Sequence, residues 1–439
     1  MTTEFIAAFE STYLPAHDVD VLETSGHTRH WRTDLELLAE CGIRRLRYPV
    51  RWHRVEEEQG TYDWASTDVV LEHLRDQGFE PIVDLVHHTS YPRWLGGFLD
   101  PDFAPVYLAY CAEFAQRYPW VREYTLFNEA FSTLFLSGHE GIWPPYGRGM
   151  ESFVQMLINV FPAVAEASRI YRELLPGAKH VYVDTCEGHV GYDEIGRGYA
   201  AMANDRRFFL LDLMLGRELD DRQPFVQEVL IAGGESLLEM RPGEVDVLGL
   251  DYYAHSEWCF SERGGLAPSR DPQGLAELAR QYHEHAGLPV MLTETNVRGF
   301  APDRVSWLKY TLEQYEIAVE SSIPLNGYCW FPFIDSVDWD SLLANAAGHV
   351  DPVGVFWLDE KLQRRTSSMS EWFTKVVAGC PSRDVPAYRF QPPLDRWLQG
   401  FIAQLDHWDW QDPPPEEIGM CANTRTIHAN WEVVDDFVW

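Results

Sequence analysis

Eight short apolar runs, separated by segments with helical periodicity, constrain the fold of this chain most strongly. The runs cover residues 5–10, 43–50, 80–88, 122–129, 180–186, 245–253, 289–295 and 325–333. Amphipathic segments such as 33–42, 66–78, 106–118 and 164–177 lie between them, and several end in glycine, as helix C-termini prefer. Because a parallel strand pair needs a crossover that returns the chain to the same end, this alternation predicts a parallel α/β sheet.

The number of strands favours a closed sheet over an open one. Eight strand–helix units are the number that closes a (β/α)8 barrel. A doubly wound open sheet is the alternative, and it usually carries a glycine-rich phosphate turn after its first strand. The segment "FESTYLP" after the first run has no glycine. We therefore predict a single (β/α)8 TIM barrel with an irregular C-terminal extension.

The last sixty or so residues differ in character from the rest. We predict a catalytic barrel over residues 1–380 and an extension rich in proline and tryptophan over 381–439. Five tryptophans argue against plain disorder, because disordered tails are poor in aromatic residues: Trp397, Trp408, Trp410, Trp431 and Trp439. Two interpretations stay open, namely packing on the outside of the barrel, or a partial cover for a site or a subunit contact.

Composition excludes several classes of function. A formal net charge of -33 argues against nucleic acid and anionic membranes as partners, since both need a basic surface. The seven cysteines are scattered without a C-x-x-C pair, which is typical of reduced thiols. The N-terminus shows no signal-peptide pattern and no apolar stretch is long enough to span a bilayer. We therefore expect a cytoplasmic protein, and leave open whether it forms a homo-oligomer.

Polar and aromatic residues gather where the predicted strands end. In a (β/α)8 barrel the C-terminal rim of the strands is where active sites are built. Seven candidates lie there: Arg47, His87, Asn128, Glu129, Tyr253, Glu294 and Trp330. A metal site is not predicted, because the adjacent His87 and His88 lack a third ligand in any zinc motif. Neither a G-x-G-x-x-G nor a Walker-type loop is present, so we predict no cofactor.

Two glutamates at that rim suggest the chemistry. Glu129 ends the fourth predicted strand and Glu294 the seventh, so their side chains can face each other across the barrel mouth. A facing pair of carboxyls, one protonated and one ionised, is what cleavage of a glycosidic bond requires. Arg47 is a candidate cation for the ionised partner, with Tyr253 as a hydrogen-bond donor to it. The alternative is that each glutamate is an ordinary ion-paired group at a strand end.

Seven segments, in order along the chain, resemble glycoside hydrolase family 1, the β-glucosidase family. "TLFNEAF" is similar to its T-x-N-E-P motif, and "VMLTETNVRG" to its (I/V)-T-E-N-G segment. "LRYPVRWHRV", "PIVDLVHHTSYPRWL", "VDVLGLDYYA", "GYCWFPFIDSVDW" and "VGVFWLDEKLQRRTSSMSEWF" resemble the remaining family motifs. The resemblance covers residues 1 to about 378.

This resemblance implies a retaining β-glycosidase that hydrolyses O-glycosidic bonds of a small glycoside by double displacement. Glu129 would be the general acid/base and Glu294 the nucleophile, with Arg47 and Tyr253 orienting the nucleophile. The remaining positions would contact the sugar: Asn128 the 2-hydroxyl, His87 a 3-hydroxyl, Trp330 the apolar ring face, and Asp338 with Trp339 the 3-, 4- and 6-hydroxyls. A transglycosylase on the same scaffold and a non-catalytic sugar-binding barrel are the alternatives.

The departures from the family pattern concentrate at positions that read the sugar. Ala130 replaces the proline after the acid/base, and Asp251 stands where asparagine is usual. Asp338 is one methylene shorter than the usual glutamate, and "ETNVRG" adds Arg298 beside the nucleophile. The N-terminal glutamine of the family has no clear counterpart, although Glu10 or Tyr13 is a candidate for its place. The sequence thus predicts the reaction, but neither the sugar nor the aglycone.

Overall fold

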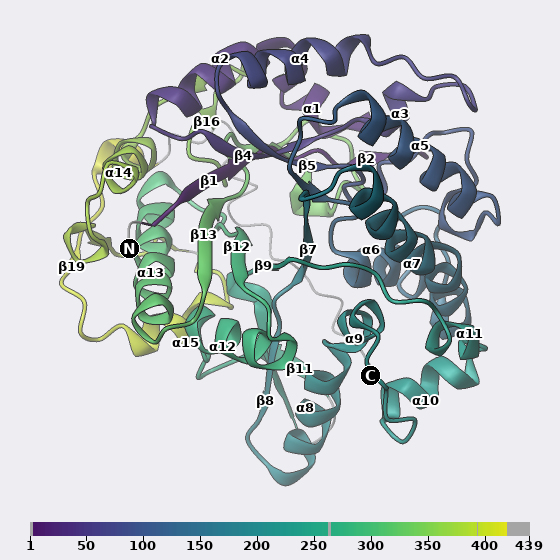
Figure 1. The fold of residues 1–439 in the computed structure, drawn as a ribbon. Helices are drawn as coiled ribbons and strands as arrows, with labels where there is room; N and C mark the ends of the chain where they lie inside the picture. The colour runs from purple at the N-terminus through teal and green to yellow at the C-terminus, as the bar shows by residue number, and fades with distance from the viewer. Residues whose placement is uncertain (1–2, 262–264, 393, 419–439) are drawn as a thin grey trace.

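The computed structural model describes residues 3–261, 265–392 and 394–418, and within them eight parallel strands close into a barrel. Their order around the barrel is β1-β13-β12-β9-β7-β6-β5-β4, with β1 pairing to both β13 and β4 (Figure 1). The barrel strands are β1 (Phe5–Ala8), β4 (Arg45–Pro49), β5 (Glu80–Asp84), β6 (Glu123–Thr125), β7 (Lys179–Thr185), β9 (Val247–Asp251), β12 (Val290–Glu294) and β13 (Leu325–Trp330). Each coincides with one of the eight predicted runs, which confirms the predicted (β/α)8 fold.

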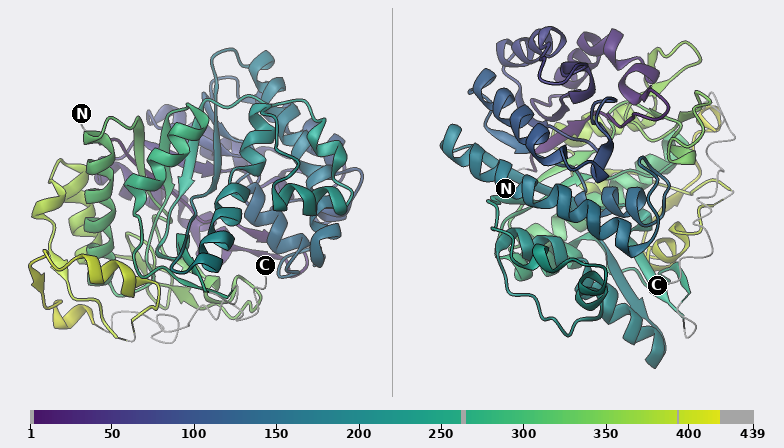
Figure 2. Two further views of the ribbon diagram at one scale, coloured as in Figure 1. Left: turned by 90° about the horizontal axis from the view of Figure 1, so that it is seen from below. Right: turned by 90° about the vertical axis from the view of Figure 1, so that its right-hand side faces the viewer.

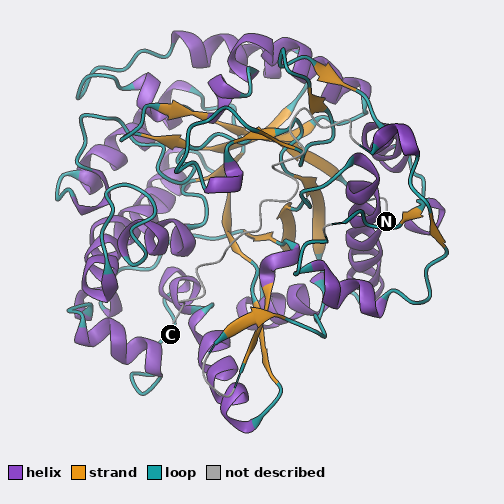
Figure 3. Cartoon of the chain, turned by 180° about the vertical axis from the view of Figure 1, so that it is seen from behind, coloured by secondary structure: helices purple, strands orange, loops and turns teal. Residues whose placement is uncertain are grey.

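Helices surround the barrel, as Figure 3 shows from behind, with the strands enclosed by helices. The helices of the first half are α1 (Val21–Thr24), α2 (His27–Glu40), α3 (Trp52–Val55), α4 (Ala65–Asp76), α5 (Phe103–Arg117), α6 (Ala130–Gly138) and α7 (Gly149–Leu174). Those of the second half are α8 (Glu194–Arg206), α9 (Phe209–Leu215), α10 (Pro224–Ile231), α11 (Glu235–Leu238), α12 (Leu275–Ala286), α13 (Ala301–Glu320), α14 (Ser368–Val377) and α15 (Leu398–Gln404). None of these helices has both the length and the apolar character needed to cross a membrane.

Short strands outside the barrel form small separate sheets. They are β2 (Tyr13–Leu14), β3 (Val19–Asp20), β8 (Gly188–Gly191), β10 (Glu257–Phe260), β11 (Leu266–Pro268), β14 (Ser336–Val337), β15 (Val350–Asp351), β16 (Trp357–Leu358), β17 (Arg364–Arg365), β18 (Ala387–Tyr388) and β19 (Trp410–Gln411). Strands β8, β10 and β11 form a separate three-stranded sheet. This sheet lies beyond the C-terminal ends of β7 and β9, so it adds a wall on one side of the mouth.

The interior of the barrel is apolar and closely packed. Side chains from its strands form one cluster of buried residues: Ile6, Ala8, Ile82, Val181, Val183, Val247, Met291 and Cys329, with Phe331 above them. Gly249 of β9 has no room for a side chain, because a Cβ there would lie 2.6 Å from Val183 and 2.8 Å from Thr293. A packed interior of this kind leaves only the rim open for a ligand.

The described part of the extension, residues 381–392 and 394–418, packs against α13. Trp397, Phe401 and Trp408 are buried, and Phe401 lies edge-on to Trp307 with 5.4 Å between ring centroids. The indole N–H of Trp408 donates to Glu313 Oε2 at 2.9 Å. Figure 2 shows this segment in yellow beside α13. Trp431 and Trp439 lie outside the described residues.

Candidate active site

The two predicted carboxylates meet at the C-terminal rim of the barrel. Glu294 is the last residue of β12, and Glu129 lies directly before α6, where the fourth barrel strand has ended. A side-chain oxygen of Glu129 and one of Glu294 lie within 4.8 Å of each other. That spacing fits retaining glycosidases, whose carboxyl groups lie about 5 to 5.5 Å apart, rather than inverting ones, where about 6.5 to 9.5 Å leaves room for a water.

Glu294 accepts a hydrogen bond at each of its two carboxyl oxygens. Arg47 Nη1 donates to its Oε1 at 2.6 Å, and the Tyr253 hydroxyl donates to its Oε2 at 2.7 Å. Glu294 and Arg47 are both almost completely buried, so the ion pair is little screened by solvent. Each oxygen of Glu294 therefore has a fixed partner, which holds the carboxylate in one orientation.

Arg47 also orients the neighbouring Asn128. Its Nη2 donates to Asn128 Oδ1 at 2.6 Å and to Asp84 Oδ2 at 3.1 Å. Since the amide oxygen of Asn128 is held by a cation, its amide nitrogen must point the other way. Asn128 Nδ2 is buried and finds no acceptor among the described residues, so it can donate to a ligand.

His87 belongs to the same network and is held in its charged form. Its Nδ1 lies 2.8 Å from Asp84 Oδ2, and its Nε2 lies 3.5 Å from Glu10 Oε1. Burial by itself lowers the pKa of His87, but Asp84 and Glu10 outweigh burial and raise it to about 9. Glu10 in turn accepts from the backbone and hydroxyl of Thr12 and lines the cavity.

Glu129 has the opposite environment to that of Glu294. Burial raises its pKa well above the ordinary value, and the negative charges of Asp251 and Glu294 raise it further. The nearest imidazole, His88 Nε2, lies 4.0 Å away, and burial together with the charges of His87 and Arg47 keeps the pKa of His88 well below its usual value. A neutral His88 does not stabilise the Glu129 carboxylate. The surroundings of Glu129 therefore favour its protonated form.

The backbone of Glu129 adopts a strained conformation that sets the direction of its side chain. Glu129 has φ 44° and ψ 60°, in the left-handed region that non-glycine residues rarely adopt. The backbone N–H of Asn128 donates to Val86 O at 2.8 Å, and that of Glu129 donates to Val183 O at 3.1 Å, so both residues continue the barrel ladder. Strain of about 1–3 kcal/mol persists only where surrounding structure enforces it, and it clusters at functional sites.

A cavity of about 360 Å³ opens beside the two carboxyls. This volume lies within the range of about 300–1,000 Å³ that is typical of small-molecule sites. Its polar end includes Glu10, Glu129, Tyr253 and Glu294. Aromatic and aliphatic side chains make up much of the remaining wall: Phe131, Phe135, Leu136, Trp143, Trp258 and Trp397. Charged side chains also line it, among them Glu187, Arg206, Arg298 and Asp395.

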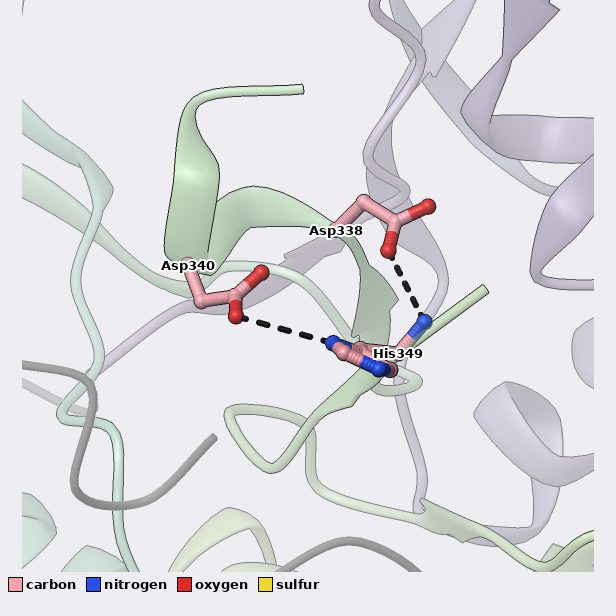
Figure 4. A group of neighbouring side chains, drawn as sticks. All are labelled: Asp338, Asp340 and His349. Atoms are coloured by element: carbon pink, nitrogen blue, oxygen red, sulfur yellow. Dashed lines mark hydrogen bonds and ion pairs between the residues drawn. The ribbon is translucent and has the colours of Figure 1, made fainter. Parts of the chain in front are cut away.

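Two residues expected to contact a sugar lie elsewhere. Trp330 is completely buried, and its indole N–H donates to Val353 O at 2.9 Å, so Phe331 lines the cavity in its place. Asp338 accepts the backbone N–H of Gly348 at 2.9 Å and, as Figure 4 shows, that of His349 at 2.8 Å. Each polar group is used inside the protein, and the two sugar contacts stay predictions. Trp339 does line the cavity.

Two further residues of the site, Asp84 and Trp397, were not predicted from the sequence as site residues, and Asp251 was noted only as a departure from the family pattern. Asp84, the last residue of β5, joins Arg47 and His87, and its position at a strand end was the available signal. Asp251, the last residue of β9, lies within 4.8 Å of both glutamates. Trp397 belongs to the extension. No motif in the sequence around it indicates that the extension returns to the barrel mouth.

Two groups of possible metal ligands occur in the described part of the chain, and hydrogen bonding occupies members of both. In the first, Asp338, Asp340 and His349 approach one another, but Asp338 already stabilises the 338–349 loop (Figure 4). In the second, Glu129, Asp251 and Glu294 approach one another, but Glu294 already pairs with Arg47.

Comparison with known proteins places this arrangement in a family. The sequence profile described as "Glycosyl hydrolase family 1" matches residues 12–260, more than half of the chain. The chain belongs to glycosyl hydrolase family 1. The predicted resemblance is confirmed, and the protein is a glycosidase of the retaining β-glycosidase type.

Individual relatives of the family are distant. Beta-glucosidase A of Thermotoga maritima is 22% identical over 390 residues, covering 80% of this chain and 86% of the relative. The furostanol glycoside 26-O-beta-glucosidase of Hellenia speciosa is 20% identical over 426 residues, covering 80% and 73%. A solved structure of the Thermotoga maritima beta-glucosidase in complex with glucoimidazole superposes with a TM-score of 0.72 at 17% identity, covering 86% of this chain and 97% of that one. The structural likeness supports the barrel fold.

Proposed function

We propose that Glu294 is the nucleophile and Glu129 the general acid/base of this retaining β-glycosidase. The observation that carries the proposal is the contrast between two carboxyls within 4.8 Å of each other. Glu294 accepts from Arg47 and Tyr253, whereas Glu129 is buried among like charges that raise its pKa. Opposite environments of this kind separate a nucleophile from a proton donor.

The reaction then proceeds in two displacements. A carboxylate oxygen of Glu294 attacks the anomeric carbon, the bond to the aglycone oxygen breaks, and Glu129 gives its proton to that oxygen. The aglycone leaves as an alcohol, and a glycosyl ester remains on Glu294. Glu129, now ionised, takes a proton from water, whose oxygen attacks the same carbon and displaces Glu294. Two inversions give retention of configuration.

Sugar recognition in this proposal uses the unoccupied polar atoms beside the carboxyls. Asn128 Nδ2 is buried without an acceptor among the described residues and would donate to the 2-hydroxyl. His87 and Glu10 would bind neighbouring hydroxyls, and Phe331 would lie against the apolar face of the ring. Glu10 takes the place of the family's usual glutamine, which supports a glucoside- or galactoside-like sugar without deciding between them.

The aglycone in this proposal is bulky and apolar. The cavity wall carries several aromatic and aliphatic side chains, among them Phe131, Trp143 and Trp397. Apolar contact area of this type stabilises a bound ligand by about 25 cal/mol per Å² removed from water. The relative from Hellenia speciosa is named for a furostanol glycoside, which agrees with an apolar aglycone.

Trapping of the covalent intermediate tests the nucleophile. A 2-deoxy-2-fluoro β-glucoside with a dinitrophenyl leaving group should inactivate the protein, add one fluoroglycosyl mass, and label the peptide that contains Glu294. The E294Q variant should take up no label. A matched control is E140Q, because Glu140 pairs with His139 and is absent from the cavity wall. A label on any other residue would overturn the assignment.

Product analysis separates hydrolysis from transfer to an acceptor. With a nitrophenyl β-glucoside in water, the expected products are free sugar and nitrophenol in equal amounts. If an added alcohol were required for turnover, the transglycosylase alternative would replace hydrolysis.

A reducing, cytoplasmic location is part of the same proposal, supported by the six described cysteines, all of which are free thiols.

A further inference from the structure

Asp251 departs from the family pattern at the centre of the site. It is completely buried, and its Oδ1 accepts from Thr293 Oγ1 at 2.6 Å. Its Oδ2 is buried and receives no hydrogen bond from a donor among the described residues. An asparagine, which is usual at this position, would be neutral there. Aspartate instead introduces a third carboxyl where two already meet.

The third carboxyl lies against Glu129. Side-chain oxygens of Glu129, Asp251 and Glu294 lie within 4.8 Å of one another, and all three residues are buried. Neither carboxylate can donate to the other while both are ionised. One proton placed between them turns the repulsion of two buried charges into a charge-assisted hydrogen bond.

The charged side chains around Glu129 and Asp251 pair with other groups and do not donate hydrogen bonds to these two carboxyls. Arg47 donates to Glu294, Asp84 and Asn128, and Tyr253 donates to Glu294, so neither donates to Glu129 or Asp251. His87 is paired with Asp84 and Glu10 on the far side of Arg47. His88 lies nearer, but burial and neighbouring cations keep it neutral. Asp184 adds a further buried carboxyl near Glu129.

We propose that Asp251 and Glu129 hold one proton between them, with Asp251 as the positioning residue for the proton donor. This inference rests on the proposed role of Glu129. In the first displacement the shared proton goes to the leaving oxygen, and the pair is left with two negative charges. That unfavourable state makes Glu129 a stronger base for the water of the second displacement, which restores the proton.

Direct titration of the side chains tests this proposal without a substrate. In protein labelled with ¹³C at the glutamate and aspartate carboxyls, the Glu129 resonance, assigned with E129Q, should titrate in two separate steps, as expected of a coupled pair. In D251N it should titrate in one step, at a pH lower by about one unit or more than the upper step of the unsubstituted protein. The same single step in both proteins would overturn the proposal.

The pH dependence of kcat/KM provides the second readout. The alkaline limb should move to lower pH in D251N by an amount that matches the titration. The matched control is D184N, since Asp184 lies near Glu129 but is only partly buried and accepts from Phe131, Tyr182 and Thr185 instead. D184N should shift the limb by less than half as much. Equal shifts in the two variants would show a general field effect and overturn the specific pairing.

The design separates this inference from the assignment of the nucleophile. Labelling by the fluoroglycoside reports on Glu294 alone, whereas the ¹³C titration reports on the pair alone. Asparagine is the usual residue at position 251 in the family, so D251N is expected to fold. If D251N does not fold, the titration of the unsubstituted protein still decides: two steps support the shared proton, and one step near the ordinary glutamate value overturns it.

Discussion

Arg47 lies 2.6 Å from Glu294 and brings a buried positive charge against a buried negative one at the mouth of the barrel. The same guanidinium contacts Asp84 and Asn128, so one side chain from β4 aligns groups that end three other strands. Lysine has a single charged nitrogen and cannot reproduce this fork of donors. The geometry of the site therefore depends on arginine and not merely on a positive charge.

Replacing Arg47 by lysine tests that dependence. R47K should lower kcat/KM at least about 100-fold and destabilise the fold by about 1–3 kcal/mol, because buried acceptors lose their donors. Steady-state kinetics and urea unfolding measure both effects. The control is R45K, on the same strand but paired with Glu123 and Glu4 at the other end of the barrel. Equal kinetic losses in the two variants would argue against a specific role for Arg47.

Removal of the proposed acid should affect substrates according to their leaving groups. E129Q should lower kcat/KM about 10²- to 10⁴-fold for alkyl glycosides, which need a proton on the departing oxygen. Dinitrophenyl glycosides, whose leaving group needs no proton, should react at nearly the normal rate in the first step. Stopped-flow measurement of phenolate release distinguishes the two. A uniform loss for all leaving groups would contradict the assignment.

The pH profile should reflect the raised pKa of Glu129. The proton donor must be protonated, so activity is present below its folded-state pKa and is lost as pH rises through it. Since burial and the charges of Asp251 and Glu294 raise that pKa, the alkaline limb of kcat/KM should lie well above the ordinary glutamate range. In E129Q this limb should disappear, and its persistence would assign it to another group.

The hydroxyl of Tyr253 should matter for the nucleophile and not for folding. Y253F removes the donor that lies 2.7 Å from Glu294 Oε2, and a hydrogen bond to a charged group contributes about 1.5–3 kcal/mol. We expect kcat to fall about 10- to 100-fold. The control is Y252F, since the adjacent Tyr252 donates at 2.8 Å to the buried Glu257, outside the carboxyl pair. Comparable kinetic losses in both would refute a direct effect.

Trp397 should select for apolar aglycones. W397L should reduce kcat/KM for naphthyl β-glucoside about 10-fold relative to methyl β-glucoside, because the extension loses an aromatic wall of the cavity. W408L is the control: Trp408 lies in the same segment but donates to Glu313 on α13 instead of lining the cavity. An unchanged substrate ratio in W397L would remove the extension from substrate binding.

Glu10 and Asp338 should respond differently to the loss of a negative charge. E10Q changes a residue on the cavity wall and should alter the ratio of kcat/KM for glucosides and galactosides several-fold. D338N should leave that ratio unchanged and destabilise the fold by about 1–2 kcal/mol, because Asp338 accepts two backbone N–H groups of its own loop. A shift of sugar preference in D338N would instead support the predicted contact of Asp338 with the sugar.

The local pattern of the sequence was sufficient to predict the barrel and its carboxyl pair. Strand runs, helical periodicity and glycine stops are short-range features, and closure of eight parallel units places every strand end at one rim. Glu129, Glu294, Arg47, Asn128 and Tyr253 could be grouped for that reason. Asp84 could have been predicted by the same argument, because it ends the strand β5.

The direction of individual side chains was decided only by tertiary structure. Trp330 ends a barrel strand like Glu294 does, yet it packs inward onto Val353, while Phe331 lines the cavity. The Asp338 carboxylate accepts two backbone N–H groups of its own loop. Trp397 reaches the mouth because the extension folds along α13. A strand fixes which residues reach the rim, but the competing hydrogen-bond partners that each side chain meets there come from distant parts of the chain.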